Sequence, residues 1–140
     1  MVCKRLRAVD IAPLLDLLPA VEFEDTGGSN GHVAYPEWLL PFAQGLDVGR
    51  VIRAVLRLLP PGQGIMAHID HPHNSWSRGR RYHLPLVTHP LVTMRWPNDG
   101  VEEHLEAGWL YEVDHLRLHE VVNRAPVERV HLVVNAGVVP

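Results

Sequence analysis

The chain has 140 residues, of which 46% are apolar and 21% are charged, and its net charge is −3 with histidine neutral. This length suits one domain with a hydrophobic core and leaves little room for a second. The net charge gives no indication of a nucleic-acid-binding face, and no stretch approaches the ~18 apolar residues that cross a bilayer. We therefore expect a single cytoplasmic domain over residues 1–140 with neither nucleic-acid nor membrane partners, and the sequence leaves its oligomeric state open.

The first 60 residues predict helices. Cys3 is the only cysteine, which excludes a disulfide within the chain, and it lies in an N-terminus that we expect to be loose. Asp10 is a plausible N-cap for a short helix over 10–18. The segment 22–36 is polar and rich in glycine, which predicts a loop. Apolar residues then recur every three or four positions from Asp47, which predicts a helix over 47–59 that ends at Pro60. The helical part thus covers about 10–60.

From Gly64 onward the pattern changes to short strands separated by turns, which we place near 64–69, 80–88, 91–96, 107–113, 116–122 and 127–134. The last of them alternates, with Val130 and Leu132 on one face and Arg129 and His131 on the other. Many short strands preceded by helices predict a mainly β fold. We expect a jelly-roll, or cupin-like, β core over about 64–135 with the N-terminal helices packed on one sheet.

His68-Ile69-Asp70 is a candidate metal-binding motif. Side chains two apart on a strand share a face, so the imidazole of His68 and the carboxylate of Asp70 would point the same way. His119 could complete a set of two histidines and one carboxylate, which suits a non-heme Fe(II) site with open positions. The alternative is a pair of ordinary polar residues at a strand end and an unrelated buried histidine.

Two further elements indicate carboxylate binding. Arg129 lies in an otherwise apolar strand, where an unpaired charge is costly and a guanidinium can hold a carboxylate by two hydrogen bonds. Arg81 and His83 share a face of another strand and could form a second such site. An exposed arginine and a core histidine are the structural alternatives at these positions.

These motifs together resemble a known family. The chain contains Arg81-x-His83-x-Pro85-Leu86, Gly108-Trp109-Leu110-Tyr111-Glu112, His119-x-Val121-x-Asn123 and Arg129-Val130-His131-Leu132. This order is similar to that of the aspartyl/asparaginyl β-hydroxylases, a branch of the Fe(II)/2-oxoglutarate-dependent dioxygenases. The resemblance covers about residues 64–135 and implies a double-stranded β-helix.

The resemblance also implies roles for individual residues. It makes His68 and His119 Fe(II) ligands, and Arg129 the residue that binds the distal carboxylate of 2-oxoglutarate. Arg81 and His83 then lie near the carboxylate next to the metal. Some animal members of the family lack the carboxylate ligand, whereas Asp70 gives this chain the full triad of the bacterial-type members. The hydroxyl that usually assists at the distal carboxylate has three candidates: Ser75, Ser77 and Thr88.

The implied activity is hydroxylation of a C–H bond with dioxygen and decarboxylation of 2-oxoglutarate to succinate. The substrate is expected to be an amino acid or a peptide residue, of the Asp/Asn type or a free amino acid such as proline. Segments 25–31 and 71–80 could form a lid, which makes four residues substrate-side candidates: His73, Trp76, Arg78 and Arg80. The alternatives are a non-catalytic, cupin-like metal-binding or sensing domain and a zinc or manganese cupin isomerase.

Overall fold

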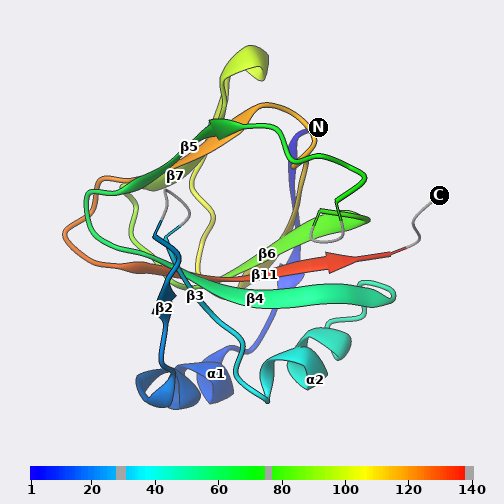
Figure 1. Ribbon diagram of the computed structural model, residues 1–140, viewed down its shortest axis with the longest axis vertical. Coiled ribbons are helices and arrows are strands. Elements are labelled where there is room, and N and C mark those ends of the chain that lie inside the picture. The colour runs from blue at the N-terminus through cyan, green and yellow to red at the C-terminus, as the bar shows by residue number, and fades with distance from the viewer. Residues whose placement is uncertain (28–30, 75–76, 138–140) are drawn as a thin grey trace.

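The computed structural model describes residues 1–27, 31–74 and 77–137, which form two facing antiparallel sheets (Figure 1). The larger sheet has the order β1-β9-β6-β11-β4-β3-β2 and the smaller one β5-β10-β7-β8. The strands of the larger sheet are β1 Cys3–Ala8, β2 Glu24–Asp25, β3 His32–Ala34, β4 Val51–Leu59, β6 Arg80–Val87, β9 Trp109–Val113 and β11 Arg129–Ala136. The smaller sheet contains β5 Gly64–His68, β7 Val92–Trp96, β8 Val101–Glu103 and β10 His119–Asn123. This arrangement is the mainly β jelly-roll that the strand pattern predicts.

The helices cover the outer face of the larger sheet, on the side away from the smaller sheet (Figure 1). They are α1 Ala12–Leu17, which continues as the 3₁₀ turn η1 Leu18–Ala20, and α2 Leu39–Gln44; a further 3₁₀ turn, η2 Pro97–Asp99, lies between β7 and β8. Leu14 and Leu39 are each 2% exposed and belong to the same hydrophobic core cluster as the sheet residue Leu132, which is fully buried. Burial of each such side chain contributes roughly 1.5–3 kcal/mol. Within the described residues, no helix has the length and apolar character needed to cross a membrane.

The short helix expected over 10–18 is present as α1 and η1. Asp10 Oδ1 accepts a hydrogen bond of 3.0 Å from the Ala12 N–H, although the N-cap position itself is Ile11. The segment 22–36, expected to be a loop, contains the short antiparallel pair β2–β3. Residues 28–30 of the lid suggested for 25–31 lie outside the described part of the chain.

The helix predicted over 47–59 is wrong, because Val51–Leu59 is strand β4, paired with β11 and β3. Both faces of β4 are covered, so its apolar residues form a nearly continuous run that fits a helical period as well as a strand period. Asp47, where the helix was expected to begin, has a φ of 57°, in the left-handed region. The conformation of this segment is decided by its pairing with neighbouring strands, and this pairing cannot be predicted from local periodicity.

The N-terminus is also ordered, contrary to expectation. Residues Cys3–Ala8 form strand β1, which pairs with β9 in a register that begins at Cys3 opposite Val113. The helical part expected over about 10–60 therefore holds only short helices, and strands from the first 60 residues supply four members of the larger sheet. The alternation in β1 is weak because most of its side chains are exposed, which hid it from pattern analysis.

Gly79 allows the chain to enter β6 close against the end of β11. Its φ is +77°, and a Cβ there would lie 2.7 Å from the Ala136 carbonyl oxygen. Gly62 has the same φ but open space around it. We expect Gly62→Ala to cost roughly 1–2 kcal/mol of unfolding free energy from backbone strain alone. Gly79→Ala should cost about 1–3 kcal/mol more, since backbone atoms must move.

Urea unfolding of both variants measures this difference. Equal losses in the two variants would contradict the close approach of Gly79 to β11.

Candidate metal and cosubstrate site

The alternation predicted for the last strand builds the floor of the site. Val130, Leu132, Val134 and Ala136 of β11 pack toward the helices. Arg129 and Val133, on the opposite face, line a cavity between the two sheets. The neighbouring strand β6 adds Arg81 and His83 to the same cavity, with Arg81 opposite Asn135 and His83 opposite Val133.

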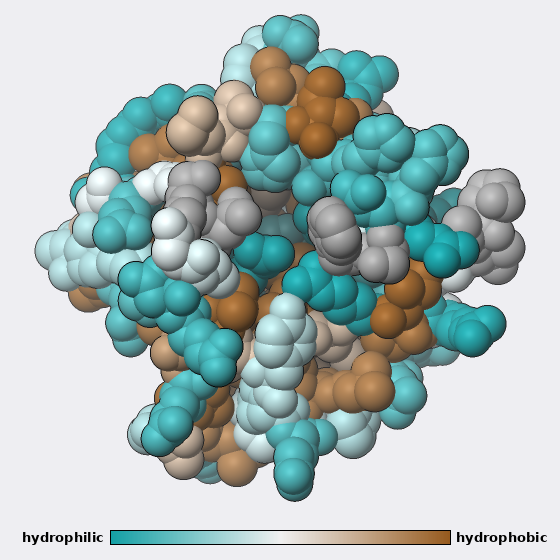
Figure 2. All heavy atoms as spheres, viewed as in Figure 1, coloured by the Kyte–Doolittle hydropathy of each residue, from teal (hydrophilic) through white to brown (hydrophobic). Residues whose placement is uncertain are grey.

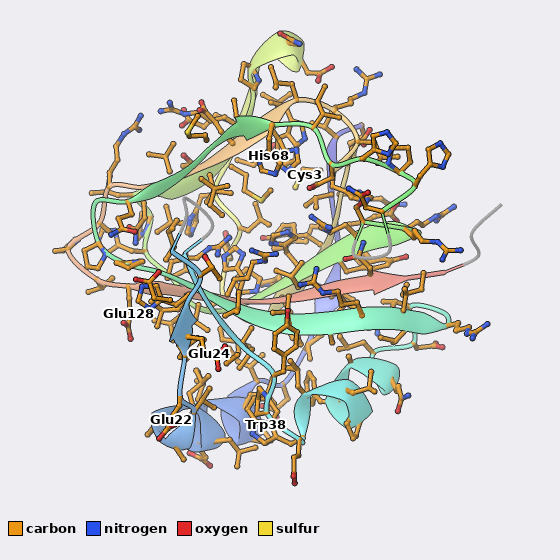
Figure 3. All side chains as sticks on the ribbon, viewed as in Figure 1. Cys3, Glu22, Glu24, Trp38, His68 and Glu128 are labelled. Carbon is orange, nitrogen blue, oxygen red and sulfur yellow. The ribbon has the colours of Figure 1, made fainter. Side chains whose placement is uncertain are left out.

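His68, Asp70 and His119 converge at this cavity. His68 ends β5 and lies directly opposite His119, which begins β10, and the two ring centroids are 4.4 Å apart. The Nε2 atoms of His68 and His119 lie 3.6 and 3.5 Å from the two carboxylate oxygens of Asp70. One potential ligand atom from each residue falls within 4.8 Å of the other two. Figure 3 shows His68 on the inner side of β5.

Backbone carbonyls fix the tautomers of both histidines. His68 Nδ1 lies 2.7 Å from the Met66 carbonyl oxygen, and His119 Nδ1 lies 2.8 Å from that of Arg117. A carbonyl only accepts, so each Nδ1 carries the proton and each Nε2 presents its lone pair to the cavity. Burial lowers the pKa of His119, which favours the neutral form. Such second hydrogen bonds are typical of metal-binding histidines.

Asp70 is held by Arg81. Arg81 Nη1 donates a hydrogen bond of 2.9 Å to Asp70 Oδ2, and its Nε donates to Asn135 Oδ1 at 3.3 Å. Burial lowers the pKa of Arg81 to about 10, and the carboxylate of Asp70 opposes that shift. The contact fixes the orientation of the Asp70 carboxylate. The family resemblance implies that Arg81 lies near the cosubstrate carboxylate next to the metal, and its contacts in the structure include a candidate metal ligand, Asp70, and Asn135.

His115, which the sequence did not indicate, anchors the segment that carries Asp70. Its Nε2 donates to the Ser77 carbonyl oxygen at 2.6 Å, and its own carbonyl accepts from the Asp70 N–H at 3.1 Å. His115 is buried, and burial lowers the pKa of its imidazole. His115 is one of many histidines and lies in a turn, so no sequence pattern indicates that it anchors this segment.

The cavity has a volume of about 150 Å³. Pockets for drug-sized ligands are usually ~300–1,000 Å³, so this one suits a small molecule. Figure 2 shows a hollow with hydrophilic residues around it on this face of the molecule, between the sheets. Apolar side chains also contribute to the lining: Ile65, Met94, Val121 and Val133.

Arg129 is a buried cation without a counter-charge among the described residues. It is 1% exposed, and neither its Nε nor its Nη1 has a hydrogen-bond partner there. Burial lowers the pKa of Arg129 to about 9, and the nearby charge of Arg57 lowers it further. Unsatisfied buried donors each cost about 1–3 kcal/mol or more when charged, so the site is built to receive an anion.

His83 and His131 form a buried pair behind the candidate metal ligands. Their Nδ1 atoms are 3.0 Å apart, so one donates and the other accepts. Burial, followed by the charge of Arg129, lowers the pKa of both imidazoles well below their usual value, which keeps both neutral. His131 was recognised from sequence only as part of a motif, and its pairing depends on β6 lying beside β11.

The substrate-side candidates do not line the cavity in the described residues. His73 is exposed and contacts His71, with ring centroids 5.2 Å apart. Arg78 and Arg80 are exposed, and Arg80 forms an ion pair with Glu112 at 3.7 Å. Trp76 lies outside the described residues.

The candidate hydroxyls also differ in their surroundings. Ser77 donates to the His71 carbonyl oxygen, so it is already occupied. Thr88 Oγ1 is buried without a partner in the described part of the chain. Ser75 lies outside the described residues.

Comparisons with known proteins place these observations in context. A search of curated proteins found no match. Among solved structures, a prolyl-4-hydroxylase from Pseudomonas putida matches with a TM-score of 0.61 and 20% identity, over 97% of this chain and 93% of that one. A cupin domain from Bordetella pertussis matches with a TM-score of 0.50 and 19% identity, over 64% of this chain and 85% of that one. At these identities the two matches support the fold alone.

A protein-family model gives the more specific result. The model of the aspartyl/asparaginyl β-hydroxylases matches residues 42–137, which include β4 to β11 and every residue that lines the cavity. The chain belongs to the aspartyl/asparaginyl β-hydroxylase family.

Proposed function

We propose that this protein is an Fe(II)/2-oxoglutarate-dependent hydroxylase that acts on an amino acid or a peptide residue. The observation that carries the proposal is that one small cavity combines a candidate cation site with a candidate anion site. The two Nε2 lone pairs and the Asp70 carboxylate form a three-ligand set at one place. The unpaired, buried guanidinium of Arg129 lines the same cavity.

The donor set fits the proposed metal. Two imidazoles and one carboxylate on one face suit non-heme Fe(II) and leave other positions open. When bound, Fe(II) and 2-oxoglutarate would supply the oxidising chemistry, in which dioxygen is consumed, the cosubstrate becomes succinate and carbon dioxide, and a substrate C–H bond becomes C–OH. A metal-binding sensing domain would have no use for Arg129, whose burial without an anion is unfavourable.

In this proposal, the residues of the protein bind and orient the metal ion and the cosubstrate. His68, Asp70 and His119 would hold the ion, and Arg81 keeps the Asp70 carboxylate in place through its hydrogen bond. Arg129 binds the distal carboxylate of the cosubstrate through its free Nε and Nη1 donors. If His131 donates to His83, the proton of His83 lies on Nε2, where it can donate to the carboxylate next to the metal. The apolar lining limits the access of water.

The test is turnover of 2-oxoglutarate. Purified protein with Fe(II), a reductant and oxygen is expected to form succinate slowly even without a substrate, as followed by NMR. Anaerobic protein is the control, because no succinate should form without oxygen. Iron-loaded, reduced protein that neither binds nor consumes 2-oxoglutarate would instead support the sensing-domain alternative. A mass-spectrometric screen of amino acids and peptides for the gain of one oxygen would then identify the substrate.

A further inference from the structure

A third arginine at the cavity, besides Arg81 and Arg129, has no role in the site as described so far. Arg57, in β4, lines the same cavity as His68 and Arg129. It is half-buried, and no hydrogen bond or ion pair joins it to any other described residue. Burial lowers the pKa of Arg57, and the neighbouring charge of Arg53 lowers it further. An unpaired cation at a cavity wall is a candidate for ligand binding.

The strand register brings Arg57 close to Arg129. In the antiparallel pair β4–β11, Arg57 lies opposite His131 and Leu59 lies opposite Arg129. Arg57 and Arg129 are therefore diagonal neighbours on the inward face, where backbone positions are ~7–8 Å apart and long side chains can meet. The register therefore places both arginines at neighbouring inward positions, and both line the cavity.

Unsatisfied polar atoms gather at these positions. In the described residues, the buried side-chain atoms without a hydrogen-bond partner are Thr88 Oγ1, Arg129 Nε, Arg129 Nη1 and His131 Nε2. Arg129 and His131 are successive inward positions of β11, and Thr88 directly follows Val87, which pairs with Val130. A carboxylate has two oxygens and about four acceptor sites, which is enough for two guanidinium groups.

We propose that Arg57 and Arg129 together bind the distal carboxylate of the cosubstrate, and that Arg57 makes the site selective for a 2-oxo dicarboxylate over a 2-oxo monocarboxylate. This inference rests on the proposed function. Like charges at neighbouring positions repel, so the empty cavity is destabilised and a carboxylate between the two cations relieves it. Arg57 therefore favours binding of the cosubstrate and destabilises the ligand-free protein.

Calorimetric titration of the Mn(II)-loaded protein measures binding without turnover. The ligands are 2-oxoglutarate and 2-oxovalerate, which has a methyl group in place of the distal carboxylate. Arg57→Met keeps the apolar stem and removes the charge, and it should weaken 2-oxoglutarate binding roughly 10- to 100-fold. Binding of 2-oxovalerate should not change. Arg57→Lys should give an intermediate loss, because lysine keeps the charge without the planar fork.

Arg53→Met is the matched control. Arg53 lies on the same strand and carries the same charge, but its Nη2 donates to the Tyr35 hydroxyl at 2.7 Å and it does not line the cavity. Its removal should leave 2-oxoglutarate affinity unchanged. Equal weakening in Arg53→Met and Arg57→Met would mean a general effect of charge and would overturn the proposal.

Thermal melting distinguishes a ligand-binding role of Arg57 from a purely structural one. Ligand-free Arg57→Met should melt above the wild type, and its rise in melting temperature on adding 2-oxoglutarate should be smaller. A wild type that binds 2-oxoglutarate while Arg57→Met binds it equally well would overturn only the role of Arg57. A wild type with no affinity for 2-oxoglutarate would overturn the proposed function itself.

Discussion

Replacing His119 by alanine is expected to abolish stable metal binding and, with it, 2-oxoglutarate turnover. His119 is 4% exposed, and its Nε2 is one of the candidate ligand atoms. Loss of a partner that merely orients a ligand costs about 10- to 100-fold in metal affinity, so loss of a ligand itself should cost roughly 100-fold or more. Metal analysis after gel filtration and titration with Mn(II) measure the effect.

His89→Ala is the control for the loss of an imidazole. His89 Nδ1 accepts a hydrogen bond from the Leu91 N–H in a turn, and His89 does not line the cavity. Metal content and succinate formation should be unchanged in this variant. Full metal content in a folded His119→Ala protein would remove His119 from the ligand set.

Arg129→Met should produce the largest loss of cosubstrate binding. Removal of one partner of a buried charge pair costs 2–5 kcal/mol, which corresponds to roughly 30- to 5,000-fold in the dissociation constant of 2-oxoglutarate. Methionine keeps an unbranched apolar chain in the cavity, so the change removes mainly the guanidinium. Titration of the Mn(II)-loaded protein measures this affinity, and an unchanged value would remove Arg129 from the binding site.

The same variant should be more stable than the wild type without ligand. The guanidinium is fully buried and its Nε and Nη1 are unpaired within the described residues. Replacing buried charge by well-packed apolar groups can stabilise a protein by about 1–4 kcal/mol. Urea unfolding without ligand measures this gain. A variant that loses both stability and binding would indicate a packing defect rather than the loss of an anion site.

The sequence alone predicted the second half of the fold. Turn residues separate the strands from β5 onward, and in β11 strict alternation assigns Arg129 inward and Val130 toward the helices. The three candidate metal ligands were likewise chosen from local spacing and a family resemblance, and the structure brings them together. These features could be predicted from the sequence because each depends on the side-chain alternation of one strand or on a short motif.

Tertiary structure decided the rest. Strand β4 has a sequence that fits a helix, and only its pairing between β3 and β11 makes it a strand and turns Arg57 into the cavity. Strand β1 depends on β9, more than 100 positions away in the sequence, and the contact between Arg81 and Asp70 depends on the approach of the two sheets. Hydrogen-bond pairing between distant strands overrides weak local preference, and no local pattern records which distant strand will be the partner.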